Sequence, residues 1–415
     1  MPDSGRIAER LERLWALASG PGGGADRPAY SPAEAEAMLL VAGWAREHGL
    51  EPGIDAHGNL WALPAGWSGA IVTAGSHVDT VPDGGRYDGA LGTVLGLELV
   101  ADLEPARGDL EAGAGERARA GLLVCAAEEA PRFGAGTLGS RLMAGTIQRS
   151  ALSQLRDAAG VTAAEALDAY LRELRELPRV KPPLDRWRAH AEVHVAQRRA
   201  LRTLGVVTTV ASPRRFAVQV IGEAGHSGEI PMAARHDALA AAAEMVLAVE
   251  AAAHRQPDET VATVGTVAVS PGALSVIPGE ARLGIDVRGI SSESLAEIDA
   301  EIRASVAEIA DRRGVRATVE QVRGGDPATL DGDLVDAALS AAREHGIPAS
   351  ATWSGAGHDA QHIAALAPAL LLFVPLHGGE SHTPQEGASM DEILQAATVM
   401  SSVLSACALD SRRGV

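Results

Sequence analysis

Short apolar runs of strand length alternate with helical patterns along most of this chain of 415 residues. The runs at 70–74, 121–127 and 369–374 have the composition of strands buried on both faces, and 31–48 has helical spacing. Such alternation is typical of a parallel-rich sheet covered by helices. The sequence therefore predicts an α/β fold, with a further helix at 154–180.

The pattern changes between residues 212 and 324. Three strand-like segments lie here, at 216–221, 262–269 and 281–287. Two long helical patterns accompany them, at 237–254 and 292–312. Two helices on a small sheet form an α+β module, and a chain of this length exceeds one ordinary core. We therefore predict a catalytic domain formed by residues 1–211 and 325–415, with residues 212–324 inserted into it.

The composition narrows the class of partner. The formal net charge is -18 and aromatic residues make up 3% of the chain. Nucleic-acid binding depends on Lys and Arg that neutralise phosphates, and single strands are bound on aromatic platforms. We therefore expect a small-molecule partner and no nucleic acid.

The two cysteines, Cys125 and Cys407, lie far apart and imply no disulfide framework. Residues 1–17 mix charged and apolar side chains, unlike a secretory signal. No later stretch reaches the roughly 18 uncharged apolar residues that a membrane span needs. We expect a cytoplasmic protein without membrane contact, with a mobile surface loop at the Gly-, Ala- and charge-rich stretch 104–119.

The first candidate metal-binding segment follows the apolar run at 70–74. It contains His77 and Asp79, and Asp88 follows eleven residues after the histidine. Open α/β sheets place their sites at strand ends, and imidazole and carboxylate are usual zinc ligands. Asp79 is suited to orient the ring of His77 without binding metal itself. The alternative is a surface loop whose His and Asp are merely solvated.

Glu128 and Glu129 form a second candidate segment, at the end of the run 121–127. Adjacent side chains of a strand point to opposite sides, so the two carboxylates would have different surroundings. One could then bind metal while the other moves protons. An exposed acidic turn is the commoner fate of such a pair.

His194 and His382 are the third and fourth candidates, and each alone is more often a core or surface histidine than a ligand. Short polar motifs stand between them, at 225–228, 275–279, 286–288 and 354–359. We predict a metal site from the order in which all these segments occur along the chain.

Together these segments resemble the amidase, hydantoinase and carbamoylase branch of the dinuclear aminoacylase and carboxypeptidase superfamily. This branch includes N-carbamoyl-L-amino-acid hydrolases, allantoate amidohydrolases and β-ureidopropionases. At least seven motifs occur in the family's order, from 29–31 to 381–382. The resemblance implies a metallopeptidase-like catalytic domain, an inserted α+β lid and dimerisation domain, a homodimer, and metal-dependent amidohydrolase activity.

The resemblance also implies residue roles. The family's metal ligands fall on His77, Asp88, Glu129, His194 and His382, with Asp88 bridging two divalent ions. Glu128 becomes the general base, and His226, which the family takes from the partner subunit, stabilises the oxyanion. The substrate-contacting positions fall on Gln197, Ser275 and Arg288, of which Arg288 would grip a substrate carboxylate. Zn²⁺ or Mn²⁺ is expected, and Co²⁺ or Ni²⁺ suits the same donors.

Two positions depart from the family's pattern. Ala196, followed by Arg198 and Arg199, replaces a carboxylate beside a ligand, and Ser275 replaces an asparagine. The leading prediction is hydrolysis of the carbamoyl or ureido C–N bond of an N-carbamoyl amino acid or related ureido acid. An aminoacylase or dipeptidase, and a binding protein with a retired metal site, are the alternatives. We also expect the strand at 216–221 and its neighbours to present an edge through which two modules pair.

Overall fold

The computed structural model describes residues 2–103, 117–197, 201–377 and 380–409. Most of the loop expected at 104–119, together with Arg198 and Arg199, lies outside the described residues. The chain folds into two compact units. Unit 1 combines Met1–Thr208 and Thr329–Val415, and unit 2 is the continuous segment Thr209–Ala328.

Unit 1 is built around a mixed sheet whose strand order is β1-β2-β4-β3-β5-β15-β6-β13, with β14 paired to β6. Its strands are β1 (Leu50–Ile54), β2 (Leu60–Pro64), β3 (Ile71–Ala74), β4 (Arg119–Val124), β5 (Trp187–Val195), β6 (Leu204–Val210), β13 (Ala328–Thr329), β14 (Ala349–Ser354) and β15 (Ala369–Val374). Strands β4, β3, β5 and β15 are parallel, which confirms the α/β prediction. The flanking pairs β1–β2, β2–β4 and β15–β6 are antiparallel. A short turn joins β1 to β2, and only antiparallel neighbours can be joined that tightly.

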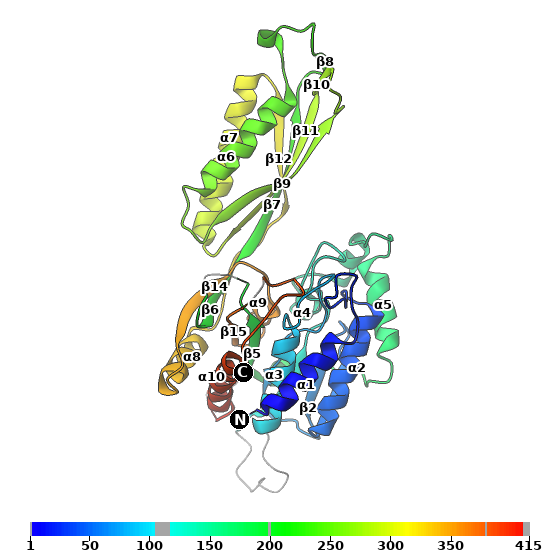
Figure 1. Ribbon diagram of the computed structural model, residues 1–415, viewed down its shortest axis with the longest axis vertical. Coiled ribbons are helices and arrows are strands. Elements are labelled where there is room, and N and C mark those ends of the chain that lie inside the picture. Colours follow the sequence, from blue (N-terminus) through cyan, green and yellow to red (C-terminus); the bar gives the residue numbers. More distant parts are fainter. Residues whose placement is uncertain (1, 104–116, 198–200, 378–379, 410–415) are drawn as a thin grey trace. The chain divides into compact units, whose positions relative to one another are not determined.

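Helices cover this sheet (Figure 1). They are α1 (Ser4–Trp15), α2 (Pro32–Glu47), α3 (Ala90–Leu103), α4 (Leu138–Met143), α5 (Ala163–Glu173), α8 (Gly332–Glu344), α9 (Asp359–Ile363) and α10 (Met390–Leu409). Helix α2 begins where the Ser31 side chain accepts the N–H of Glu34, with Pro32 in the first turn. Among the described helices α10 alone is long and apolar enough to cross a membrane, but half of that stretch is buried and α10 packs against β5, β15 and α8.

The helix predicted at 154–180 is shorter than expected. A 3-10 helix covers Arg149–Gln154, and α5 starts only at Ala163. In between, the Asp157 side chain accepts the N–H groups of Ala159 and Val161 and so forms a turn. A reciprocal pair of hydrogen bonds between Thr162 and Glu165 then begins the helix.

Unit 2 contains a four-stranded antiparallel sheet of order β12-β7-β11-β9, with two helices on it. Its elements are β7 (Ser212–Ile221), β9 (Val261–Ser270), β11 (Glu280–Gly289), β12 (Arg316–Arg323), α6 (Ala238–Ala253) and α7 (Ser292–Arg313), with the small ribbon β8 (Gly225–His226) and β10 (Val276–Ile277). Alternate residues of β7 and β11, such as Val218 and Leu283, are buried in the core under the helices. The strand at 216–221 does not itself form an edge, because β7 lies between β12 and β11, but its neighbour β12 does. Among the described strands of this sheet, the edges are β9 and β12.

Candidate metal centre

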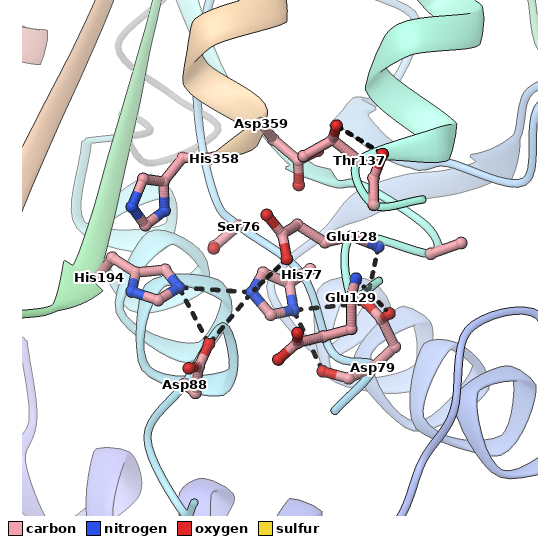
Figure 2. Close-up of polar contacts among 12 residues, drawn as sticks. Ser76, His77, Asp79, Asp88, Glu128, Glu129, Thr137, His194, His358 and Asp359 are labelled. Carbon is pink, nitrogen blue, oxygen red and sulfur yellow. Dashed lines mark hydrogen bonds and ion pairs between the residues drawn. The ribbon is translucent and has the colours of Figure 1, made fainter. Parts of the chain in front are cut away.

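Three buried side chains converge at the carboxyl ends of the parallel strands. His77 follows β3, His194 lies near the end of β5, and Asp88 stands just before α3. Asp88 Oδ1 lies 3.0 Å from Nε2 of His194 and 3.4 Å from Nε2 of His77. The two Nε2 atoms are 3.4 Å apart, and Figure 2 shows the three side chains pointing toward one another. This group has donor atoms close enough to hold one metal ion.

The hydrogen bonds of the two rings show which nitrogens face the centre. Nδ1 of His77 lies 3.1 Å from the carbonyl oxygen of Asp79, and Nδ1 of His194 lies 3.0 Å from that of Val195. A carbonyl oxygen can only accept, so each Nδ1 carries a hydrogen, and in the neutral ring each Nε2 then presents a lone pair to the centre. Two such lone pairs and a carboxylate oxygen, all within 3.4 Å of one another, form a donor set that suits a divalent cation.

A second group shares Asp88 with the first. Nε2 of His382 lies 3.1 Å from Asp88 Oδ2 and 3.6 Å from Glu129 Oε1. Glu129 Oε1 is buried without a hydrogen-bond partner among the described residues, which is costly unless a cation compensates it. Asp88, Glu129 and His382 therefore fit a second ion, and Asp88 has one carboxylate oxygen directed to each group.

The electrostatics of the second group show an excess of negative charge. Burial and the neighbouring Asp88 raise the pKa of Glu129 to about 7. The hydrogen bond to Asp88 raises the pKa of His382 to about 9. Both shifts mean that the group attracts positive charge, which two divalent ions would supply.

Glu128 and Glu129 have different surroundings, as predicted, but for another reason. They lie beyond the end of β4, after Ala127, whose φ of 54° turns the chain. Glu128 Oε2 lies 3.9 Å from Nε2 of His77, and Glu128 belongs to neither metal group. The Asp79 carboxylate accepts the N–H of Glu128 at 3.1 Å and that of Glu129 at 2.9 Å. Asp79 thus contacts both His77 and the glutamate pair.

Two glycines allow the ligand loops to approach this closely. At Gly75, with φ 147°, an added Cβ would lie 1.8 Å from the carbonyl oxygen of Leu123. At Gly89, with φ 64°, a Cβ would lie 2.3 Å from the His77 ring. A side chain at either position would push the His77 loop out of place.

Sequence reasoning assigned no role to Ser381 or Glu386. The Ser381 hydroxyl donates to Asp88 Oδ2 at 2.8 Å, and the Glu386 carboxylate accepts the N–H groups of Tyr87 and Asp88 at 2.7 and 3.1 Å. Ser381 stands beside the predicted ligand His382, so the sequence motif around His382 could have indicated that Ser381 lies at the site. Glu386 had none, because its partners lie about 300 residues earlier in the chain.

Behind the histidines lies a buried polar layer. The Glu192 carboxylate accepts the Ser76 hydroxyl at 2.8 Å and the N–H of Ala360 at 2.9 Å. The Asp359 carboxylate accepts the Ser140 hydroxyl at 2.5 Å. These bonds connect β5, the loop after β3 and helices α4 and α9, so they fix the strand ends that carry the ligands.

The remaining predicted residues belong to neither of the two metal groups. Gln197 is half-buried in unit 1, two residues after β5. His226 and Ser275 are exposed neighbours in unit 2, where the N–H of Ser227 donates to the carbonyl of Ser275 at 3.0 Å. Arg288 lies on β11 and donates to Asp286 Oδ2 at 3.1 and 3.2 Å. All five predicted metal ligands belong to unit 1.

Comparison with known proteins agrees with this geometry. Residues 73–406 match the peptidase family M20/M25/M40. An N-carbamoyl-L-amino-acid amidohydrolase of Paenarthrobacter aurescens is 34% identical, over 96% of this chain and 98% of that protein. An allantoate amidohydrolase of Bacillus subtilis is 30% identical, over 93% of each. A hydantoinase/carbamoylase family amidase from Burkholderia phymatum has a similar structure, with a TM-score of 0.84, 31% identity and 99% of both chains covered. The chain thus belongs to the peptidase family M20/M25/M40 and is a hydrolase of C–N bonds that binds divalent metal.

Proposed function

We propose that this hydrolase cleaves the carbamoyl or ureido C–N bond of an N-carbamoyl amino acid or a related ureido acid, at a centre of two metal ions. The observation that carries the proposal is the Asp88 carboxylate, whose two oxygens face two separate ligand groups. Two relatives that cover nearly the whole chain, named N-carbamoyl-L-amino-acid amidohydrolase and allantoate amidohydrolase, support the substrate class.

His77, Asp88 and His194 would hold one ion, and Asp88, Glu129 and His382 would hold the other. Zn²⁺ and Mn²⁺ suit these nitrogen and carboxylate donors, as do Co²⁺ and Ni²⁺. Bound divalent ions supply Lewis acidity, which polarises a carbonyl and lets water ionise near neutral pH.

Glu128 is the proposed general base. It takes a proton from the attacking water and delivers it to the leaving nitrogen. Burial, together with the carboxylates of Glu129 and Asp359, raises the pKa of Glu128 well above its ordinary value despite the opposing effect of His77. A raised pKa suits a group that must hold this proton between the two steps.

We assign substrate contacts to Gln197, Ser275 and Arg288, and oxyanion stabilisation to His226. Arg288 would bind a substrate carboxylate through its two-pronged guanidinium. Ser275 offers a single hydroxyl, which restricts the hydrogen bonds that it can make with a ureido group.

His226 and Arg288 lie far apart within one unit 2. A homodimer in which each active site receives residues from both subunits would account for this separation. The ribbon of β8 and β10 joins the unit 2 sheet at the Glu280 end of β11, where the N–H of Gly222 donates to the carbonyl of Gly279 (Figure 1). Arg288 lies eight residues farther along β11, roughly 27 Å at the rise of a strand. One small substrate cannot span that distance within one unit 2. We therefore propose that His226 serves the site of the partner subunit. Cys125 and Cys407 are both buried and form no disulfide, which supports a cytoplasmic location.

A hydrolysis screen of the protein loaded with Zn²⁺ or Mn²⁺ tests the proposal. Carbamoyl amino acids, allantoate and ureidoglycolate should release ammonia together with the free amine or its product. Release of amine only from acyl amino acids or dipeptides would favour the aminoacylase or dipeptidase alternative. Failure to bind either metal and to hydrolyse any substrate would indicate a retired site.

A further inference from the structure

Glu34 lies in the first turn of α2, is fully buried and belongs to neither metal group. Its Oε1 accepts the N–H of Ala127 at 2.8 Å, across 93 residues of sequence. Its Oε2 accepts the N–H of Tyr30. The side chain therefore ties the start of α2 to the residue that directly precedes the Glu128–Glu129 pair.

Both donors adopt a strained backbone conformation. Tyr30 has a φ of 51° and Ala127 a φ of 54°. Residues other than glycine rarely occupy this left-handed region, and they persist there only where the surroundings hold them. Glu34 contacts the backbone at both strained positions, so it is placed to hold them.

The bond to Ala127 is part of a longer clamp. Three successive N–H groups, those of Ala127, Glu128 and Glu129, each donate to a buried carboxylate. Glu34 accepts the first and Asp79 accepts the other two. Glu34 belongs to α2, and Asp79 lies in the loop after β3. Two separate parts of the chain therefore hold the backbone of the segment whose side chains, Glu128 and Glu129, point to the metal centre.

We propose that Glu34 is a positioning residue, which keeps Ala127 in its left-handed conformation and thereby aims Glu128 and Glu129 at the metal centre. The inference rests on the proposed function, in which Glu129 binds metal and Glu128 moves the proton. A purely structural Glu34 would affect thermal stability and leave metal binding and kcat unchanged.

The two hydrogen bonds that Glu34 accepts require a carboxylate at this position. A carboxylate accepts from both N–H groups, whereas a glutamine of the same shape has one accepting oxygen and one donating NH₂. In Glu34→Gln the NH₂ group must face one of the two N–H donors, so one contact becomes repulsive. The variant changes this interaction with almost no change in volume.

The experiment measures Zn²⁺ binding and steady-state kinetics of the full-length protein. Glu34→Gln should weaken the second Zn²⁺ by roughly tenfold to a hundredfold and lower kcat by a similar factor, with a smaller change in KM. Glu98→Gln is the matched control, because Glu98 is equally buried but binds Arg6 and Arg10 between α1 and α3. It should lower the Tm while both Zn²⁺ affinities and kcat stay within about twofold of the unsubstituted protein.

Ala127→Gly supplies a rescue. Glycine adopts a positive φ without strain, so Ala127→Gly in the Glu34→Gln background should restore part of the lost Zn²⁺ affinity and kcat. A merely structural defect at Glu34 would not respond to this second change. If Glu34→Gln does not fold, Glu34→Asp keeps the charge and both acceptors but is one methylene shorter, and the same losses are expected.

The inference is overturned if the folded Glu34 variant binds two Zn²⁺ ions and turns over like the unsubstituted protein, or if Ala127→Gly restores nothing. Failure of the proposed function looks different. In that case the unsubstituted protein itself would release no ammonia from carbamoyl or ureido acids, whatever residue stands at position 34.

Discussion

The carboxylate of Glu386 accepts the backbone N–H of Asp88 at 3.1 Å, although the two residues are 298 positions apart. Asp88 is the residue that the two ligand groups share. Glu386 therefore fixes the peptide that carries the shared ligand, and it does so from the same loop that supplies His382.

We predict that Glu386→Ala weakens metal binding. Loss of the acceptor frees the loop around Asp88, and removal of a group that orients a ligand typically costs roughly tenfold to a hundredfold in affinity or activity. Titration with Zn²⁺, followed by metal analysis after dialysis, measures the effect. Glu392→Ala, which removes the surface partner of His377, is the control and should bind as before. Equal affinities in both variants would mean that Asp88 is held without Glu386.

We predict that Glu128→Gln loses turnover and keeps its metal. Glu128 belongs to neither ligand group, so the substitution removes a proton acceptor without removing a ligand. General-base catalysis is worth roughly 10²–10⁴ in rate. Metal content and kcat are measured on the same preparation. Glu129→Gln is the contrast, because it should lose the second ion. A Glu128→Gln protein within about tenfold of normal activity would contradict the role of base.

A sharing of sites between subunits predicts complementation. Glu128→Gln and His226→Ala should each be inactive alone. After subunit exchange, a heterodimer contains one site with both residues intact, so activity should return toward half of normal for each such dimer. Exchange is followed with differently labelled subunits. Demonstrated exchange without recovered activity would show that each chain completes its own site or that His226 is not catalytic.

The affinity of the second group for Zn²⁺ should rise with pH. In the group without metal, Glu129 has a pKa of about 7 and His382 a pKa of about 9. Below pH 7, Zn²⁺ binding must displace the protons of both residues, so the affinity should change by about a hundredfold per pH unit. Between pH 7 and 9 only His382 is protonated, and the affinity should change by about tenfold per unit. Competition with a chelator of known pH dependence measures this slope. A flat affinity from pH 6 to 9 would contradict the proposed ligands.

Several features of this protein were predictable from local sequence. The apolar runs at 70–74 and 369–374 are buried strands of the structure, because side-chain burial on both faces leaves a clear local pattern. His77 and His194 stand at strand ends, and parallel strands bring their carboxyl ends to one edge of the sheet, so the convergence of these residues could be inferred.

Other features were decided only by the tertiary structure. The position of β7 inside its sheet depends on which strands pair with it, and the local sequence at 216–221 does not indicate which strands these are. Glu34 and Glu386 stand in segments without any metal-binding motif, yet both are buried. A buried carboxylate must find hydrogen-bond donors, and here the backbone N–H groups of Ala127 and Asp88, which only the folded chain brings within reach, supply them.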